Sequence, residues 1–589
     1  MRVAAGGSRM KKYLIIFIMI ASVIVFSACT SANSPSETTN NDDNTTTNSE
    51  TQNNGQLSLI SSDTDAITTN QTVDSKTGVT VIDGAKITNT WNLATIDLSS
   101  YQDQQVTIDF TCTMKVVSSD SSDTTLLWQV NDSDASYPTV ASGTFTSGEW
   151  KTITGTLSSY TVGKSKVIYL SSYGLTKENL VITISYLKVT ITANWLSATS
   201  LKDTYANYFD KFGIAITYDE LKTTAVQSGL ARHASSITMG NEFKPDFIFN
   251  WVTPNTSGSF TGSNGKAIAV PTNTPNWTKP DAILQICKDK GLTMRGHVLV
   301  WHSQTPDWFF HKDFNTSEDY VDTDTMNARM EWYIKTVLTH VTEWENTNNS
   351  GKHIIYTWDV VNEATSDSAT DTKWLRGSNG ETSNWYSVYK DDSFIINAFR
   401  YANKYAPSDV LLAYNDYNTY IGSSNATGTG GKTNAILKLI DAVQACESDA
   451  TLPTRLDVMG MQSHVGISYP NVTGTDSYET AVKKFIAKGL YVQVTEIDIA
   501  NGTTTYNDAT LKAKYKEYFT MFLNNRKTTS SKGISGVTIW GINDGSTWLN
   551  ALTQYNGYTQ YPLLFNDDYT CKPAFYGVIE AATEYTSKD

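Results

Sequence analysis

Residues 354–363, IIYTWDVVNE, show the pattern from which the fold of this chain can be predicted. An apolar stretch rich in β-branched and aromatic residues favours a buried strand, and it ends in the polar pair Asn362 and Glu363. Similar runs recur from about Leu201 onward. Between them lie segments whose apolar residues have helical spacing, such as Asp281–Lys290 and Thr433–Val443.

Eight runs of this kind can be placed, and strands that alternate with helices are typical of βα units. Eight parallel strands with intervening helices predict an α/β fold, a (β/α)8 or TIM barrel, over residues 200–589. The runs centre on Phe212–Thr217, Ser236–Gly240, Leu292–Trp301, Ile354–Val361, Leu411–Tyr414, Leu456–Met461, Leu490–Thr495 and Gly536–Trp540.

Seven of these runs end in polar or ionisable residues. In barrel enzymes the active site forms at the carboxyl ends of the strands, so we expect these side chains to share one site. From the second run to the eighth they are Asn241 and Lys244; His297, Trp301 and His302; Asn362 and Glu363; Asn415 and Asp416; Gln462 and His464; Glu496 and Asp498; and Trp540.

Glu363 and Glu496 follow the fourth and seventh strands, which lie across the barrel mouth from each other. Two facing carboxyl groups are what cleavage of a glycosidic bond needs, and a separation of about 5–5.5 Å gives retention of configuration. At that distance one group stays protonated while the other is ionised. Taken alone, the two residues are better explained as a pair of solvated glutamates at strand ends.

The segments Trp358–Ala364 and Thr495–Asp498 closely resemble the acid/base and nucleophile signatures of glycoside hydrolase family 10. Further similar segments are His297–Gln304, Gly240–Pro245, Gln462–His464 and Trp540–Gly541, and the resemblance runs from about Leu201 to Thr586. This family consists chiefly of retaining endo-β-1,4-xylanases on a TIM barrel, so the resemblance implies hydrolysis of xylan and xylo-oligosaccharides.

The resemblance also implies a role for each matching position. Gly240 stands where many members have glutamate, which would remove a hydrogen bond to the second sugar. Glu363 would be the acid/base and Glu496 the nucleophile, Asn362 would bind the sugar 2-hydroxyl, and His464 would orient Glu496 with support from Gln462. The non-reducing side of the cleft would be lined by Asn241, Lys244, His297, Trp301 and Gln304. The platform over the reacting sugar would be formed by Trp540 and Trp548.

The N-terminus has the pattern of an export signal. Basic residues precede an apolar run at Tyr13–Val25, and Ala28-Cys29 resembles a bacterial lipoprotein box, so residues 1–29 are expected to be a lipoprotein-type signal peptide. Lipidation of Cys29 would anchor an exported protein to the membrane at the cell surface, and the protein would be secreted without it. An uncleaved anchor helix is the alternative. Residues 30–74 are interpreted as a disordered spacer rich in Ser, Thr and Asn.

Residues 75–195 contain strand-like runs separated by Ser, Asp and Gly clusters, which predicts an all-β, jelly-roll-like sandwich with a core separate from that of the barrel. The region loosely resembles family 22 and related carbohydrate-binding modules. We expect Trp150 to be a core residue. Candidates to line a glycan cleft are Trp91, Tyr101, Trp128 and Tyr137.

The charge and cysteine content of the sequence argue against several classes of function. The net charge of −14 opposes binding to nucleic acid, and five cysteines without a CxxC pair make a disulfide scaffold or a zinc site improbable. No cofactor and no catalytic metal ion are expected, and the protein is expected to be a monomer. Two alternatives remain open: a glycan-binding protein on an inactive barrel, and a hydrolase that acts on a mixed or aryl glycoside.

Overall fold

The computed structural model describes residues 56–59, 71–74, 79–83, 95–98, 101, 104–133, 135–163, 167–171, 180–249, 252–426 and 428–585. The signal segment with Cys29, most of the expected spacer and Trp91 lie outside these residues. Among the helices it describes, none is both long and apolar enough to cross a membrane.

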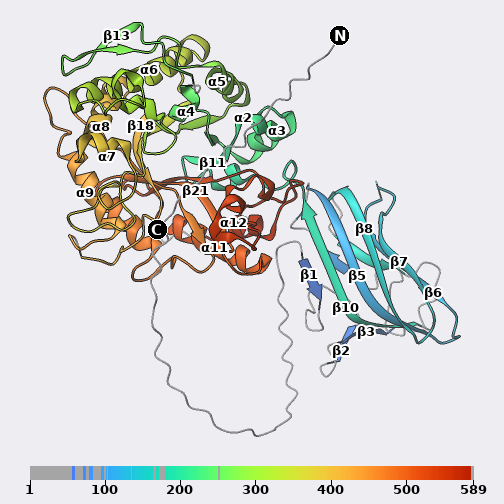
Figure 1. Cartoon of the computed structure of the whole chain (residues 1–589). Coiled ribbons are helices and arrows are strands. Elements are labelled where there is room, and N and C mark those ends of the chain that lie inside the picture. The colour runs from blue at the N-terminus through green and yellow to red at the C-terminus, as the bar shows by residue number, and fades with distance from the viewer. Residues whose placement is uncertain are drawn as a thin grey trace, which may run out of the picture.

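The C-terminal region is a closed barrel of eight parallel strands, as predicted (Figure 1). Each strand pairs with its neighbours in chain order, and the ring closes where β22 pairs with β11 and β15 pairs with β17. The strands are β11 (Lys211–Ile216), β12 (Ser236–Met239), β15 (Thr293–Gly296) with its short continuation β16 (Val300–Trp301), β17 (Ile355–Asn362), β18 (Leu411–Asp416), β19 (Val458–Met461), β21 (Tyr491–Ala500) and β22 (Ile534–Ile539), and β20 (His464–Gly466) is a short addition to β21.

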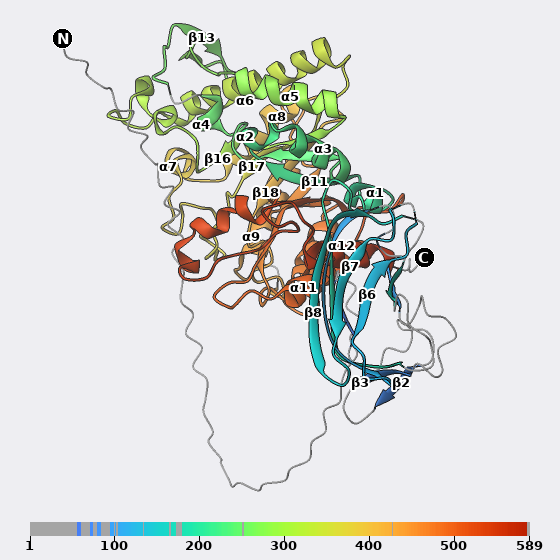
Figure 2. The same cartoon turned by 90° about the vertical axis from the view of Figure 1, so that its right-hand side faces the viewer.

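Helices follow the strands and cover the outside of the barrel (Figures 1 and 2). The predicted helical segments are confirmed as α5 and α9. The α-helices are α1 (Leu201–Tyr205), α2 (Tyr218–Leu221), α3 (Thr224–His233), α4 (Pro245–Ile248), α5 (Thr278–Lys290), α6 (Thr323–Asn348), α7 (Asn384–Tyr389), α8 (Ser393–Tyr405), α9 (Lys432–Gln444), α10 (Tyr478–Ala487), α11 (Asp508–Asn524) and α12 (Pro573–Thr583), with short 3-10 helices η3 (Asp307–Phe310), η4 (Lys312–Phe314), η5 (Asp544–Ser546), η6 (Trp548–Ala551) and η7 (Thr553–Tyr555).

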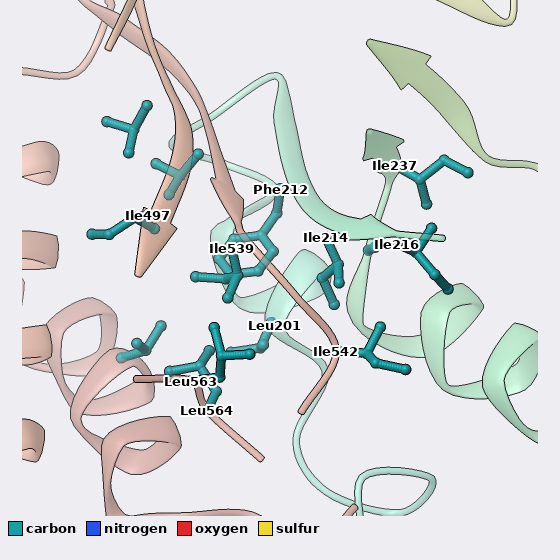
Figure 3. Close-up of a cluster of buried hydrophobic side chains, with 14 of the residues drawn as sticks. Leu201, Phe212, Ile214, Ile216, Ile237, Ile497, Ile539, Ile542, Leu563 and Leu564 are labelled. Carbon is teal, nitrogen blue, oxygen red and sulfur yellow. The ribbon is translucent and has the colours of Figure 1, made fainter. Parts of the chain in front are cut away.

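Apolar side chains fill the space between the strands and the helices. Ile214, Ile539 and Ile497 come from neighbouring strands, and Leu563 and Leu564 from the segment that leads into α12 (Figure 3). All five are at most 2% exposed. Burial of about 1.5–3 kcal/mol per large apolar side chain makes this layer the main source of barrel stability, and it fixes the strand ends that carry the site.

The N-terminal region is a two-sheet sandwich, which confirms the all-β prediction. Phe110 of one sheet packs on Trp128 of the other, with ring centroids 5.1 Å apart. One sheet contains β1 (Gln56–Leu59), β2 (Gln71–Asp74), β3 (Val79–Asp83), β5 (Gln105–Ser118), β8 (Trp150–Thr161) and β10 (Leu180–Ala193), and the other contains β4 (Thr95–Asp97), β6 (Thr124–Val130), β7 (Thr139–Phe145) and β9 (Val167–Ser171).

Three expectations about this region need correction. Disorder over the whole spacer is wrong, because β1 and β2 form inside it and pair with β10 and β3. Trp150 is not a core residue, because it is 48% exposed on β8. Among the cleft candidates, Trp128 is fully buried and Tyr101 nearly so, which leaves only Tyr137 exposed, and Trp91 lies outside the described residues.

The sandwich and the barrel share one continuous core, which also differs from the prediction of separate cores. Trp195, directly after β10, is 2% exposed and stacks on Tyr569 at 4.6 Å between ring centroids. The same indole contacts the ring of His233 at the end of α3. Tyr101 of the sandwich also meets Tyr576 of α12 at 6.1 Å. Figures 1 and 2 both show the sandwich beside the barrel at α12.

The polar segment after β12, whose role the sequence leaves open, forms the hairpin of β13 (Gly258–Thr261) and β14 (Ala267–Val270). The hairpin packs on the outside of α6. Ser263 donates hydrogen bonds to the buried carboxylate of Glu331 on that helix, which anchors the hairpin away from the strand ends.

Candidate active site

A cleft of about 740 Å³ opens at the carboxyl ends of the barrel strands. Residues from the ends of all eight strands line it, as expected for an active site on this fold. It contains all the barrel side chains to which the family resemblance assigned a role: Asn241, Lys244, His297, Trp301, Gln304, Asn362, Glu363, Gln462, His464, Glu496, Trp540 and Trp548. Of the other strand-end residues, His302 and Asp498 also line the cleft, whereas Asn415 and Asp416 are fully buried and do not line it. Cys29, the predicted lipidation site, lies outside the described residues.

Neutral donors surround the carboxyl group of Glu363. The indole Nε1 of Trp301 donates to Oε2 at 2.9 Å, and the amides of Gln462 and Asn362 donate to Oε1 at 2.8 and 3.1 Å. Gln462 was expected to support His464, and the structure instead places its amide on Glu363. The Glu363 side chain is thus held in one orientation by uncharged groups.

Glu496 has a different environment, because one of its donors is charged. Oε2 is 3.1 Å from Nε2 of His464, and Oε1 accepts from the Asn415 amide at 2.9 Å. On the other side of the imidazole, Nδ1 lies 3.0 Å from Oδ1 of Asp498. Burial alone lowers the pKa of His464, but the carboxylates of Asp498 and Glu496 raise it to about 10. The imidazolium therefore donates charge-assisted hydrogen bonds to both carboxyl groups.

Sequence reasoning gave no role to two residues that complete this arrangement. Asn415 donates through Nδ2 to both Asn362 Oδ1 and Glu496 Oε1, each at 2.9 Å, so one amide links the surroundings of the two glutamates. Asp498 accepts from His464 and, through Oδ2, from the Trp548 indole at 2.9 Å. Both residues follow predicted strands, so the strand-end pattern already contained the signal.

At another part of the cleft Lys244 forms a polar cluster with its neighbours. Its Nζ donates to Gln304 Oε1 at 2.9 Å and lies 5.0 Å from the ring centre of Trp301. Burial lowers the pKa of Lys244 to about 8. Gly240 lies beside this cluster, where a Cβ would meet no atom closer than 3.7 Å, so the cleft is open at the position of the missing side chain.

A buried ion pair beneath the cleft holds His297. Asp359 Oδ2 accepts from Nδ1 of His297 at 2.9 Å and from Nε of Arg295 at 3.0 Å. Burial raises the pKa of Asp359, but the Arg295 charge outweighs it and the net shift is downward. The carboxylate therefore stays ionised and fixes the imidazole of His297 at the cleft wall.

The site combines one carboxyl group among neutral donors with a second one beside an imidazolium, and both line the same cleft. Such a pair can protonate a leaving oxygen and attack the adjacent carbon. Among the residues that the structure describes, no group of three or more His, Cys, Asp or Glu side chains is placed to hold a metal ion.

Comparison with known proteins agrees with this chemistry. The chain is 33% identical over 384 residues to endo-1,4-beta-xylanase Y of Acetivibrio thermocellus and 35% identical over 387 residues to the bifunctional endo-1,4-beta-xylanase XylA of Ruminococcus flavefaciens. These matches cover 64% and 66% of the chain but only 32% and 34% of the relatives, so the chain spans about a third of their length.

A solved structure has the same pair of folds. It is the crystal structure of the CBM22-1 and GH10 modules of Clostridium thermocellum endo-1,4-beta-D-xylanase 10B complexed with xylohexaose. It is 26% identical with a TM-score of 0.52, and the match covers 86% of this chain and 92% of that one. Residues 200–581 match the family model for glycosyl hydrolase family 10. Because this match includes well over half of the sequence, the chain belongs to glycosyl hydrolase family 10.

Proposed function

We propose that the protein is a retaining endo-β-1,4-xylanase that hydrolyses internal bonds of xylan. The observation that carries the proposal is the difference between the two glutamates of one cleft. Glu496 accepts from the His464 imidazolium, whereas the carboxyl group of Glu363 accepts only from neutral side chains. The charged donor favours an ionised nucleophile at Glu496, and the neutral donors leave Glu363 free to hold a proton.

The proposed reaction has two displacements. In the first, Glu363 transfers its proton to the glycosidic oxygen as the bond to C1 breaks, and Glu496 attacks C1 to form a glycosyl ester. In the second, Glu363 takes a proton from water, whose oxygen attacks C1 and releases Glu496. The two inversions together retain the β configuration.

Asn362 is proposed to hydrogen-bond the 2-hydroxyl of the sugar at the cleaved bond, a contact that strengthens in the transition state. Trp540 and Trp548 line the cleft and would cover the reacting sugar, where bulk near C5 favours xylose over a hexose. Asn241, Lys244, Gln304 and His297 would hold the sugars on the non-reducing side.

The experiment is an assay of reducing ends on xylan, cellulose and mixed-linkage glucan, with the product anomer followed by NMR. We expect activity on xylan with β product formed first. Preferred hydrolysis of mixed-linkage glucan or of aryl glycosides alone would favour the alternative hydrolase, and absence of turnover on all substrates would favour a glycan-binding protein.

The sandwich is proposed to bind glycan through the exposed face that carries Trp150. On β5 and β8, Lys115 lies opposite Trp150 in register, with Nζ 5.1 Å from the indole centre, and Tyr186 on β10 is 40% exposed. We expect Trp150→Ala to weaken retention on insoluble xylan while activity on soluble oligosaccharides stays the same. Tyr558→Ala, an exposed tyrosine of the barrel, is the control.

Export and lipid anchoring at Cys29 are proposed from the sequence pattern of the signal, and a monomeric state is proposed with them. A bacterial host that expresses the full chain should incorporate labelled fatty acid into the wild type and not into Cys29→Ala. The variant should leave the membrane fraction and elute as a monomer. A Cys29→Ala protein that stays in the membrane would favour an uncleaved anchor helix.

A further inference from the structure

Glu363 has a backbone conformation that needs external support. Its φ is 57°, in the left-handed region that non-glycine residues rarely adopt, directly after β17 ends. The amide of Glu363 donates to the Asn415 carbonyl at 2.9 Å, and its carbonyl accepts from Nε of Arg376 at 2.7 Å. The Arg376 guanidinium thus holds the main chain of the acid/base residue from a position thirteen residues further along the chain.

The same guanidinium reaches a second residue of the cleft wall. Its Nη2 donates to the hydroxyl of Tyr417 at 2.8 Å, and both residues line the cleft. Tyr417 lies after β18, three strands along the ring from β12, after which the Lys244 cluster lies. Arg376 therefore connects the backbone of Glu363 to an aromatic side chain of the cleft wall.

Lys432, Asp416 and Asp367 are the charged residues that surround Arg376 and Tyr417. Lys432 is fully buried, with Nζ 3.7 Å from the ring centre of Tyr417 and ion pairs to Asp416 at 2.9 Å and Asp367 at 2.5 Å. Burial lowers the pKa of Arg376, but Tyr417, Glu363 and Asp416 raise it above the ordinary value. The two cations and two aspartates compensate each other, so the guanidinium remains charged and fixed.

We infer that Arg376 is a positioning residue that fixes the acid/base Glu363 for proton transfer and ties its placement to the wall formed by Tyr417. A general acid acts only within hydrogen-bond reach of the leaving oxygen. Without the guanidinium, the Glu363 carbonyl and the Tyr417 hydroxyl lose a shared partner, and the left-handed turn loses one of its two main-chain anchors. The inference rests on the proposed function of the cleft.

The test compares two substrates that differ in their need for an acid. The measured quantity is kcat/KM. The dinitrophenolate of 2,4-dinitrophenyl β-xylobioside leaves without being protonated, whereas the phenolate of phenyl β-xylobioside needs a proton from a general acid to leave. For Arg376→Lys we expect kcat/KM to fall about 10- to 100-fold on the phenyl substrate, part of the 10²–10⁴-fold that general acids contribute, and to change less than about threefold on the dinitrophenyl substrate. Glu363→Ala should give the same pattern with a larger difference.

Two further variants make the result decisive. Arg455→Lys changes a half-buried arginine that bonds Asp457 and main-chain carbonyls away from the cleft, and it should leave both substrates unaffected. Tyr417→Phe keeps the ring and removes only the hydroxyl that Arg376 contacts, so it should reproduce the selective loss at smaller size even where Arg376→Lys folds poorly.

An equal loss on both substrates, or no loss on either, in well-folded Arg376→Lys and Tyr417→Phe would overturn the inference. Failure of the proposed function is distinguishable from these outcomes, because the wild-type protein would then release no reducing ends from xylan, whatever its rates on the two xylobiosides.

Discussion

Replacing His464 by alanine should move the acidic limb of the pH profile. In the proposed mechanism the acidic limb reports loss of the ionised nucleophile Glu496. In the structure Glu496 accepts from the His464 imidazolium at 3.1 Å and from the neutral Asn415 amide at 2.9 Å. With a pKa of about 10, His464 is charged across the acidic and neutral range, so the variant removes a cation that favours ionised Glu496. The acidic limb should therefore shift to higher pH.

The size of the shift follows from the type of bond that is lost. A hydrogen bond to a charged group contributes about 1.5–3 kcal/mol, and 1.36 kcal/mol corresponds to one pH unit, so we expect a shift of about one to two units. The variant also removes the group that separates Glu496 from the Asp498 carboxyl group, which bonds the other ring nitrogen of His464, and this acts in the same direction. The two carboxyl groups titrate as a coupled pair, so the shift belongs to the pair.

The assay is kcat/KM against pH on xylohexaose for the wild type and His464→Ala, with calorimetric binding of a non-hydrolysed xylo-oligosaccharide. Binding should change modestly. His340→Ala is the matched control, because it removes another histidine that pairs with a carboxylate, Asp281, at 2.7 Å outside the cleft, and it should leave both limbs in place. An unchanged acidic limb together with much weaker binding would show that His464 acts on the sugar and not on Glu496.

Other variants test the remaining parts of the structure. Glu496→Ala should abolish turnover, and azide should restore cleavage with an inverted, α-configured product seen by NMR; rescue with a β product would reverse the two glutamate roles. Trp195→Ala should lower the free energy of unfolding by about 3–5 kcal/mol in denaturant titrations while kcat/KM stays the same below the transition, whereas Trp150→Ala, on an exposed face, should change stability by less than about 0.5 kcal/mol. Asp359→Asn leaves the buried Arg295 without its counter-charge and should destabilise by about 3–5 kcal/mol, measured in the same way; a loss under 1 kcal/mol would contradict the buried pair.

The barrel was predictable because its signal is local and repeated. An apolar run of four to eight residues favours a buried strand, and polar residues that follow such a run lie at the carboxyl end of a parallel sheet. All eight runs coincide with strands, and most of the predicted side chains after them line one cleft, except Asn415 and Asp416, which are fully buried. The family motifs added roles to positions that the strand-end pattern had already brought together.

The error at Trp150 has a simple geometric reason. Successive side chains of a strand point to opposite faces, and Ile153, an odd number of residues away, is 5% exposed in the core. Trp150 therefore lies on the outer face, a result that parity predicts and that the preference of tryptophan for cores obscured. Its 48% exposure follows from position in β8 and not from residue type.

Partnerships between polar side chains were harder to predict, because they depend on which strand ends face each other and on loops of irregular shape. Gln462 was expected beside His464, two residues away, but its amide meets Glu363 from a strand two places away in the ring. Arg376 lies in the connection after β17, where no periodic pattern applies. Its role becomes visible only when the hydrogen bond to the Glu363 carbonyl is known.

The packing of the sandwich against the barrel was also hard to predict, because it depends on contacts between residues that are far apart in the sequence. The first region has a pattern of strands alone and the second a pattern of strands that alternate with helices, so the sequence favours two separate cores. In the structure, however, the indole of Trp195 packs between His233 and Tyr569 of the barrel, two residues more than three hundred positions apart. Because β10 ends two residues before this buried indole, the sandwich has no flexible linker to the barrel. The face that carries Trp150 therefore keeps a fixed orientation relative to the cleft, and the glycan binding proposed for this face would not cost the entropy of ordering a linker.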